Sequence, residues 1–330
     1  MGRSATGIID HPIQAVPISV VDIETTGLYA GGDRVVEISI VRIEPGHEPK
    51  LILDTLVNPH RRVSATEIHG ITDDDVKDAP AFEEIAGDIA SSLKGSVLAA
   101  YNVYFDLRFL EDEFGRVGFR KMPPNLCLMY MRPLLGLGNK CCLTDACRAC
   151  GVQHDDAHRA ASDAMASAHL WSHFKDAMNE MHIVLFRDLS KLRTYKFLES
   201  LRHPLLDDRS TSSLPSSGHF KPRSHPERES KSSAGRGAGT TSRTLQLREY
   251  WDILTSAVAD LELTKREIDE LAAKRKELDI TAEELRALHG RVYAAMLSDA
   301  LSDSLISDAE WHRLKRLHEC LKHLGWAPGM

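Results

Sequence analysis

Two carboxylates stand two residues apart at the end of an apolar run, and this placement is the strongest constraint on the fold. Asp22 and Glu24 follow the run that begins at Ile18. Residues i and i+2 of a strand point to the same face, so both carboxylates would project together from the edge of a sheet. At roughly 4 Å and an effective dielectric of about 20 they repel each other by roughly 4 kcal/mol, a cost that a bound divalent cation would reverse. The pair therefore predicts half of a metal site.

Two further segments supply the context that this spacing lacks by itself. Asp106 follows an apolar strand candidate at 97–101 and stands near the start of a helical pattern that ends at Gly115. Asp163 lies on a long Ala-rich helix, and His158 precedes it by five residues at the entrance of that helix. The three segments together indicate a site built from strand ends and helix starts.

In this order the residues resemble the DnaQ-like, or DEDDh, family of 3′-to-5′ exonucleases. The matches are Asp22 and Glu24 to the first motif, Asn102 and Asp106 to the second, and His158 and Asp163 to the third. Residues 67–72, EIHGIT, also resemble the stretch that links the first two motifs. The resemblance covers roughly residues 15–178. One departure is Tyr101, which stands where many members carry His before the Asn of the second motif.

The resemblance implies a two-metal phosphodiesterase. Two cations about 3.5 to 4 Å apart can stabilise both the attacking and the leaving oxygen, and hard carboxylate ligands suit Mg²⁺ or Mn²⁺. By this resemblance Asp22 would bridge both ions, Glu24 and Asp163 would complete the nucleophile side, and Asp106 would hold the leaving-group side. His158 would be the general base, because an unperturbed imidazole has a pKa of about 6.5.

The implied reaction removes mononucleotides from the 3′ end of single-stranded DNA, in proofreading or DNA repair. The residues implied to bind substrate are Phe105 and Leu28 beside the base, Thr25 and Asn102 beside the terminal sugar, and His69 from the linking stretch. Two alternatives remain. A 3′-to-5′ exoribonuclease differs only in contacts to the sugar 2′ position, which no motif here reveals. A catalytically inactive nucleic-acid-binding or interaction protein is disfavoured, because all five catalytic positions are filled.

Hydrophobic periodicity predicts an α/β fold around these motifs. The runs from Ile18, at 35–43 and at 50–57 are expected to form a three-stranded meander. Residues 80–93 carry apolar side chains at helical spacing, and 96–101 and 126–131 are expected to be further strands. The resemblance implies that these elements form an RNase H-like mixed sheet flanked by helices.

Composition divides the chain into three parts. Residues 1–204 are expected to form the exonuclease domain, with 183–201 as an appended helix. Residues 205–243 are rich in Ser, Gly, Pro, Lys and Arg, so a disordered flexible linker is expected there. Residues 244–330 are expected to form a separate four-helix module with a protein-interaction role. Capping-box patterns open three of its helices, at 264–267, 281–284 and 307–310, and the module faintly resembles TerB-like domains.

A DNA polymerase or a sliding clamp is the partner class to consider. Gln246, Leu247, Tyr250 and Trp251 loosely resemble the peptides by which bacterial polymerase and repair proteins dock on a clamp. The alternative is that these residues begin the first helix of the module and pack inward.

Other features of the sequence bear on the location of the protein and on a zinc site. The chain has 330 residues and a formal net charge of −7, and no apolar run approaches the roughly 20 residues that cross a membrane. A secretory signal pattern is lacking at the N-terminus, so a cytoplasmic location is expected. The cysteines between Cys141 and Cys150 suggest a zinc site, but no second CxxC pair follows, and buried free thiols fit the spacing better.

Overall fold

One mixed sheet of five strands organises the first of two structural units. The computed structural model describes residues 7–27, 30–64, 66–155, 158–193, 195–223, 238–258, 263, 265–300 and 308–330. The first unit comprises Met1–Thr26 and Arg34–His225, and the second comprises Gly27–Asp33 and Pro226–Met330. None of the helices in the described ranges is both long and apolar enough to cross a membrane.

The sheet has the order β3-β2-β1-β4-β5. Its strands are β1 (Ile18–Thr25), β2 (Val35–Ile43), β3 (Lys50–Leu56), β4 (Val97–Ala100) and β5 (Asn125–Cys127). β1 is antiparallel to β2 and parallel to β4, and β2 is antiparallel to β3, so the predicted meander and mixed sheet are confirmed. Every residue of β1 except Asp22 is buried, so this strand lies inside the fold on both faces.

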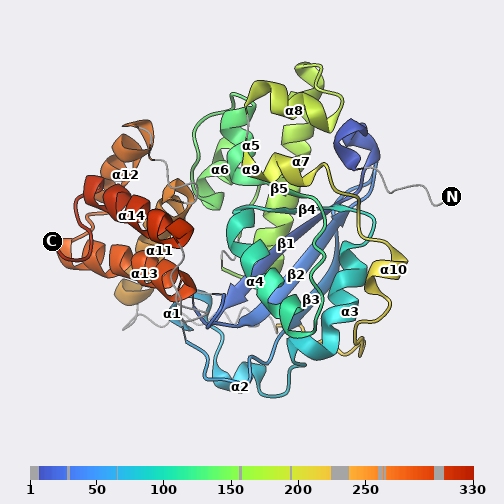
Figure 1. Cartoon of the computed structure of the whole chain (residues 1–330), viewed down its shortest axis with the longest axis horizontal. Coiled ribbons are helices and arrows are strands. Elements are labelled where there is room, and N and C mark those ends of the chain that lie inside the picture. The colour runs from blue at the N-terminus through green and yellow to red at the C-terminus, as the bar shows by residue number, and fades with distance from the viewer. Residues whose placement is uncertain are drawn as a thin grey trace. The chain divides into compact units, whose positions relative to one another are not determined.

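Helices flank the sheet (Figure 1). They are α1 (Thr66–His69), α2 (Asp73–Val76), α3 (Phe82–Leu93), α4 (Val103–Arg116), α5 (Leu128–Leu134), α6 (Leu143–Cys150), α7 (Ala160–Glu180), α8 (Phe186–Leu192), α9 (Lys196–Ser200) and α10 (Asp208–Thr211). α7 packs against β1 and β2, and α3 packs against α4. The predicted helical spacing in α3 is confirmed, because its apolar residues at 82, 85, 86, 89 and 93 are buried. α4 brings the second motif to the sheet, and α7 brings the third.

Two predicted elements differ from the structure. The run 126–131 was expected to be a strand, but β5 ends at Cys127 and α5 begins at Leu128. Burial is complete on both sides of this boundary, and a short apolar run does not distinguish a strand from a buried helix. The helix expected at 183–201 is two short helices, α8 and α9.

Residues 205–223, which we call the strap, are ordered along the first unit, so the predicted disordered linker is wrong for this segment. Its backbone accepts hydrogen bonds from Gly87 N at Pro215 O (2.6 Å) and from Leu56 N at Lys221 O (2.8 Å). A Cβ on Gly87 would lie 2.6 Å from Pro215 O, so α3 admits the strap only because this residue is glycine. Backbone hydrogen bonds hold the strap where apolar side chains are few. Residues 224–237 of the expected linker lie outside the described residues.

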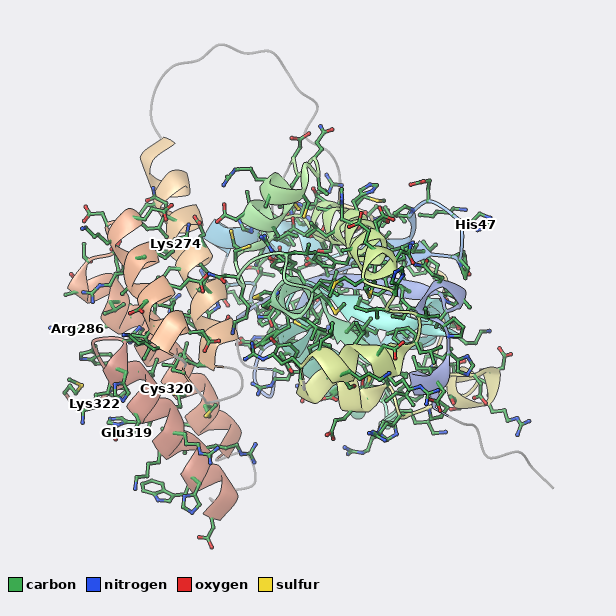
Figure 2. The ribbon with its side chains drawn as sticks, turned by 90° about the horizontal axis from the view of Figure 1, so that it is seen from above. His47, Lys274, Arg286, Glu319, Cys320 and Lys322 are labelled. Atoms are coloured by element: carbon green, nitrogen blue, oxygen red, sulfur yellow. The ribbon has the colours of Figure 1, made fainter. Side chains whose placement is uncertain are left out.

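The described residues of the second unit contain the four helices that were predicted: α11 (Ala238–Val258), α12 (Lys265–Glu277), α13 (Ala282–Ala300) and α14 (Asp308–His323). The capping box at 281–284 is confirmed, because Thr281 N donates to Glu284 Oε2 (2.9 Å) and Glu284 N donates to Thr281 Oγ1 (3.2 Å). Thr264 and Ser307 of the other two boxes lie outside the described residues. Lys274 of α12, labelled in Figure 2, forms ion pairs with Glu249 and with Glu277 (3.2 Å).

The helical unit begins earlier than residue 244. Arg243 Nε donates to Glu284 Oε1 (2.8 Å), and its NH1 donates to Leu278 O (2.6 Å) at the end of α12. The hydrogen bond from Arg243 lowers the pKa of the Glu284 carboxyl to about 2. Arg243 therefore joins α11 to the turn between α12 and α13, although it was expected to be the last linker residue.

The structure agrees with the alternative for the clamp-like peptide, in which its residues begin the first helix of the module and pack inward. Tyr250 is 1% exposed and Trp251 is 9% exposed, and both pack with Leu254 in the core of the helical unit. Gln246 Oε1 accepts a hydrogen bond from Arg243 NH1 (3.1 Å), so this side chain also serves the unit itself. The residues that docking would need therefore form contacts within the helical unit instead.

A buried histidine makes the stability of the helical unit depend on pH. His289 is fully buried between Trp326 O (2.6 Å from Nδ1) and Tyr250 OH (3.4 Å from Nε2), and burial lowers its pKa. The unfolded chain therefore takes up this proton first as the pH falls below about 6.5. We expect wild type to lose stability below that pH relative to His289→Gln, by up to about 1.4 kcal/mol per pH unit.

Urea titration at pH 7.5 and 5.5, followed by tryptophan fluorescence, measures this difference. Three of the four tryptophans lie in the second unit, so the signal reports chiefly on it. Equal acid sensitivity of wild type and His289→Gln would assign the effect to other groups.

Candidate active site

The first motif lies at the end of β1, beside a bulge. Glu24 is 3% exposed, and Asp22 is half-buried on the same face of the strand. Glu24 pairs with Glu37 of β2, and the register shifts between Glu24 and Thr25. Such bulges re-aim side chains and are frequent beside active sites. The predicted placement of both carboxylates at a sheet edge agrees with this geometry.

The third motif lies at the start of α7. Asp163 is 7% exposed in the first turn, and its Oδ2 accepts a hydrogen bond from His158 N (3.2 Å). His158 has a φ of 72°, in the left-handed region that non-glycine residues rarely adopt. The turn between His158 and the helix therefore directs the imidazole and the carboxylate to the same place.

Three of the five predicted catalytic residues meet. One ligand atom from each of Glu24, His158 and Asp163 lies within 4.8 Å of the other two. Two buried carboxylates with one imidazole are a donor set suited to a hard divalent cation, so these residues fit the predicted metal. Asp22 borders the group on the same strand face, but it is not a member of the group.

Asp106 also lies outside this group. It is 5% exposed in the first turn of α4, a helix that packs against β1 and β4. Asn102 caps the same helix, and its buried Oδ1 accepts no hydrogen bond from the described residues. Phe105 is half-buried, with its ring centroid 5.1 Å from that of Phe109. α4 thus presents an acid, an amide and an aromatic ring from one turn.

The other predicted substrate residues differ in their surroundings. Thr25 is buried at the end of β1, and Leu28 lies outside the described residues. His69 is 3% exposed; its Nδ1 accepts from Ile71 N (3.0 Å), and its Nε2 lies 3.2 Å from Ser64 O. Both ring nitrogens of His69 therefore hold the turn between these residues.

His154 is a site residue that the sequence analysis did not assign to catalysis. Its Nε2 lies 2.6 Å from Asp163 Oδ1, and its side chain is 4% exposed. His154 stands outside the three motifs, so no local pattern marks it. The spacing of nine residues to Asp163, across the start of a helix, becomes a contact only in the folded chain.

Tyr101, the residue that departs from the family pattern, has a structural role. Its hydroxyl donates to Cys141 O (2.6 Å) and Cys142 O (3.0 Å). The cysteines of this region are free, and burial raises the pKa of Cys147 to about 12. Within the described part of the chain, no candidate metal group contains two of these cysteines. The free-thiol interpretation stays a prediction.

The five-stranded mixed sheet and its flanking helices have the RNase H-like arrangement that was predicted. A family model described as an exonuclease, RNase_T, matches residues 19–171. This match agrees with the resemblance to DnaQ-like exonucleases that the motifs carry.

Curated relatives are similar over part of the chain. A DNA polymerase III subunit epsilon-like protein of Rhodobacter capsulatus is 41% identical over 115 residues, which cover 33% of this chain and 16% of that protein. A DNA polymerase III PolC-type of Oceanobacillus iheyensis is 35% identical over 155 residues, which cover 46% of this chain and 11% of that protein. The chain therefore spans only a small part of the length of these relatives.

Among solved structures, cell-death related nuclease 4 (CRN-4) aligns with a TM-score of 0.42 and 15% identity, over 51% of this chain and 65% of that chain.

Proposed function

We propose that the first unit is a metal-dependent 3′-to-5′ exonuclease that acts on single-stranded DNA in proofreading or repair. The meeting of Glu24, His158 and Asp163 at the edge of the sheet is the observation that carries this proposal. Asp22, Glu24, Asp106 and Asp163 would hold Mg²⁺ or Mn²⁺. Two such ions, when bound, supply an activated water and stabilise the charge on the leaving oxygen.

The chain's own residues supply the proton transfer and the positioning. His158 takes the proton of the attacking water, a step that contributes about 10² to 10⁴-fold in rate. Asn102 and Thr25 hold the terminal sugar, and Phe105 stacks on the terminal base. The buried acceptor of Asn102 is suited to a sugar hydroxyl, because it accepts no hydrogen bond from the described residues.

A bacterial DNA polymerase is the partner class that we propose, and the cytoplasm is the setting. The curated relatives are bacterial, and their names place them with DNA polymerase III. We propose a separate interaction role for the helical unit. Its resemblance to TerB-like domains remains a prediction.

Matched oligonucleotides labelled at the 3′ or the 5′ end, in DNA and in RNA, test the reaction. We expect the full chain with Mn²⁺ to release the 3′ label as a mononucleotide and to convert the 5′-labelled DNA into a ladder. Chelation should stop the reaction, and added Mn²⁺ should restore it. Faster loss of the RNA strand would assign the enzyme to RNA trimming, and internal cuts would contradict exonuclease action.

A further inference from the structure

The last described residue of the strap lies beside the turn that carries His158. Arg223 NH2 donates to His69 O (2.5 Å), and its NH1 lies 3.5 Å from both His158 O and Glu37 Oε2. Its own carbonyl accepts from Arg159 NH2 (2.6 Å). One guanidinium thus joins a carboxylate of β2 to the backbone on both sides of the site.

Glu37 anchors this contact. It is 0% exposed on β2, directly opposite Glu24, and its Oε2 accepts from Ala160 N (3.2 Å) at the start of α7. A carboxylate is favourable at a helix N-terminus, where unpaired backbone N–H groups point outward. Burial raises the pKa of the Glu37 carboxyl, and the charge of Arg223 acts in the opposite direction.

Three contacts therefore hold the turn between His158 and Ala160. Asp163 accepts from His158 N, Arg223 lies against His158 O, and Glu37 accepts from Ala160 N. His158 keeps its left-handed φ of 72° in this turn. A non-glycine residue persists in that conformation where the surrounding contacts hold it there. The direction of the His158 ring thus depends on a residue 65 positions further along the chain.

We propose that Arg223 is a positioning residue, which holds the 158–160 turn so that the His158 ring keeps its catalytic orientation, with Glu37 as its anchor. The inference rests on the proposed function, because it assigns no chemistry to Arg223 itself. It makes the strap a working part of the exonuclease unit.

Two variants of the full chain test the inference. Arg223→Lys keeps a positive charge beside Glu37 but loses the fork that reaches two carbonyls. Arg223→Met combined with Glu37→Gln removes both charges, leaves no buried charge unpaired, and keeps an acceptor for Ala160 N. We expect either change to lower kcat by about 10- to 100-fold, since a misplacement of about 1 Å costs up to about 10²-fold, with KM and melting temperature little changed.

Lys221→Met is the matched control on the same strap. Lys221 Nζ donates to Asp75 O (2.8 Å), while the backbone bonds that hold the strap to β3 do not need this side chain. We expect this variant to keep wild-type kcat.

The outcomes separate the two proposals. An active wild type with both Arg223 variants within twofold of its kcat overturns the inference alone. Equal losses in Lys221→Met, or a rise in KM at unchanged kcat, overturn it as well. A wild type without nuclease activity removes the proposed function and the inference together.

Discussion

Asp163→Asn and Glu24→Gln are each expected to lower the rate of hydrolysis by about 10³-fold or more. Each substitution removes one anionic ligand from the Glu24, His158 and Asp163 group while keeping the size of the side chain. Metal ions contribute several kcal/mol of charge stabilisation in the transition state, and each 1.36 kcal/mol corresponds to about a tenfold change in rate. The loss should appear in kcat at saturating substrate.

The fold should survive both substitutions. Two converging carboxylates repel each other without a cation, so the metal-free Glu24→Gln variant should melt at or above the wild-type temperature. Asp163→Asn should melt somewhat lower, because the amide keeps only one of the two oxygens that face His158 N and His154 Nε2. Added Mn²⁺ should raise the melting temperature of wild type more than that of the variants, because a ligand stabilises only the state that binds it.

Two control variants, Asp176→Asn and Glu44→Gln, make the same chemical change outside the site. Asp176 lies on the exposed side of α7, and Glu44 lies just after β2. Both should keep the wild-type rate and the wild-type response to Mn²⁺. If either site variant kept more than a tenth of the wild-type rate, the assignment of that carboxylate would be wrong.

The sequence predicted the parts of this structure that local patterns specify. Asp22 and Glu24 follow a run buried on both faces, and the start of α7 carries Asp163 at the spacing of a helix entrance. Each of these patterns lies within one segment, and the period of apolar residues and the spacing of polar ones inform only about that segment. Their convergence followed from the family resemblance, and the meeting of Glu24, His158 and Asp163 agrees with it.

The missed parts depend on pairs of residues far apart in the chain. The strap is held by backbone hydrogen bonds and by Arg223, none of which depends on the apolar periodicity from which secondary structure is predicted. Its Ser- and Pro-rich composition is that of a linker, and only its contacts in the folded chain, such as those with Gly87 and Leu56, reveal where it lies. His154 was missed for the same reason, because its contact with Asp163 belongs to no motif.

A chain that ends at residue 204 is expected to be far less stable than one that ends at residue 225. The shorter chain was first predicted to be the complete domain, but it lacks the strap and leaves Glu37 buried without Arg223. Breaking a buried ion pair from one side costs about 3 to 5 kcal/mol. For a unit of this size that corresponds to a melting temperature lower by about 6 to 20 °C.

Thermal melts of the two truncated chains measure the difference, with the full chain as reference. The chain of residues 1–225 should match the melting of the exonuclease unit in the full chain and cut short oligonucleotides at a similar rate. Adding Glu37→Gln to the 1–204 chain should recover part of the lost stability, because the amide needs no counter-charge yet can accept from Ala160 N. Equal melting temperatures for the 1–204 and 1–225 chains would mean that the strap lies against the unit without stabilising it.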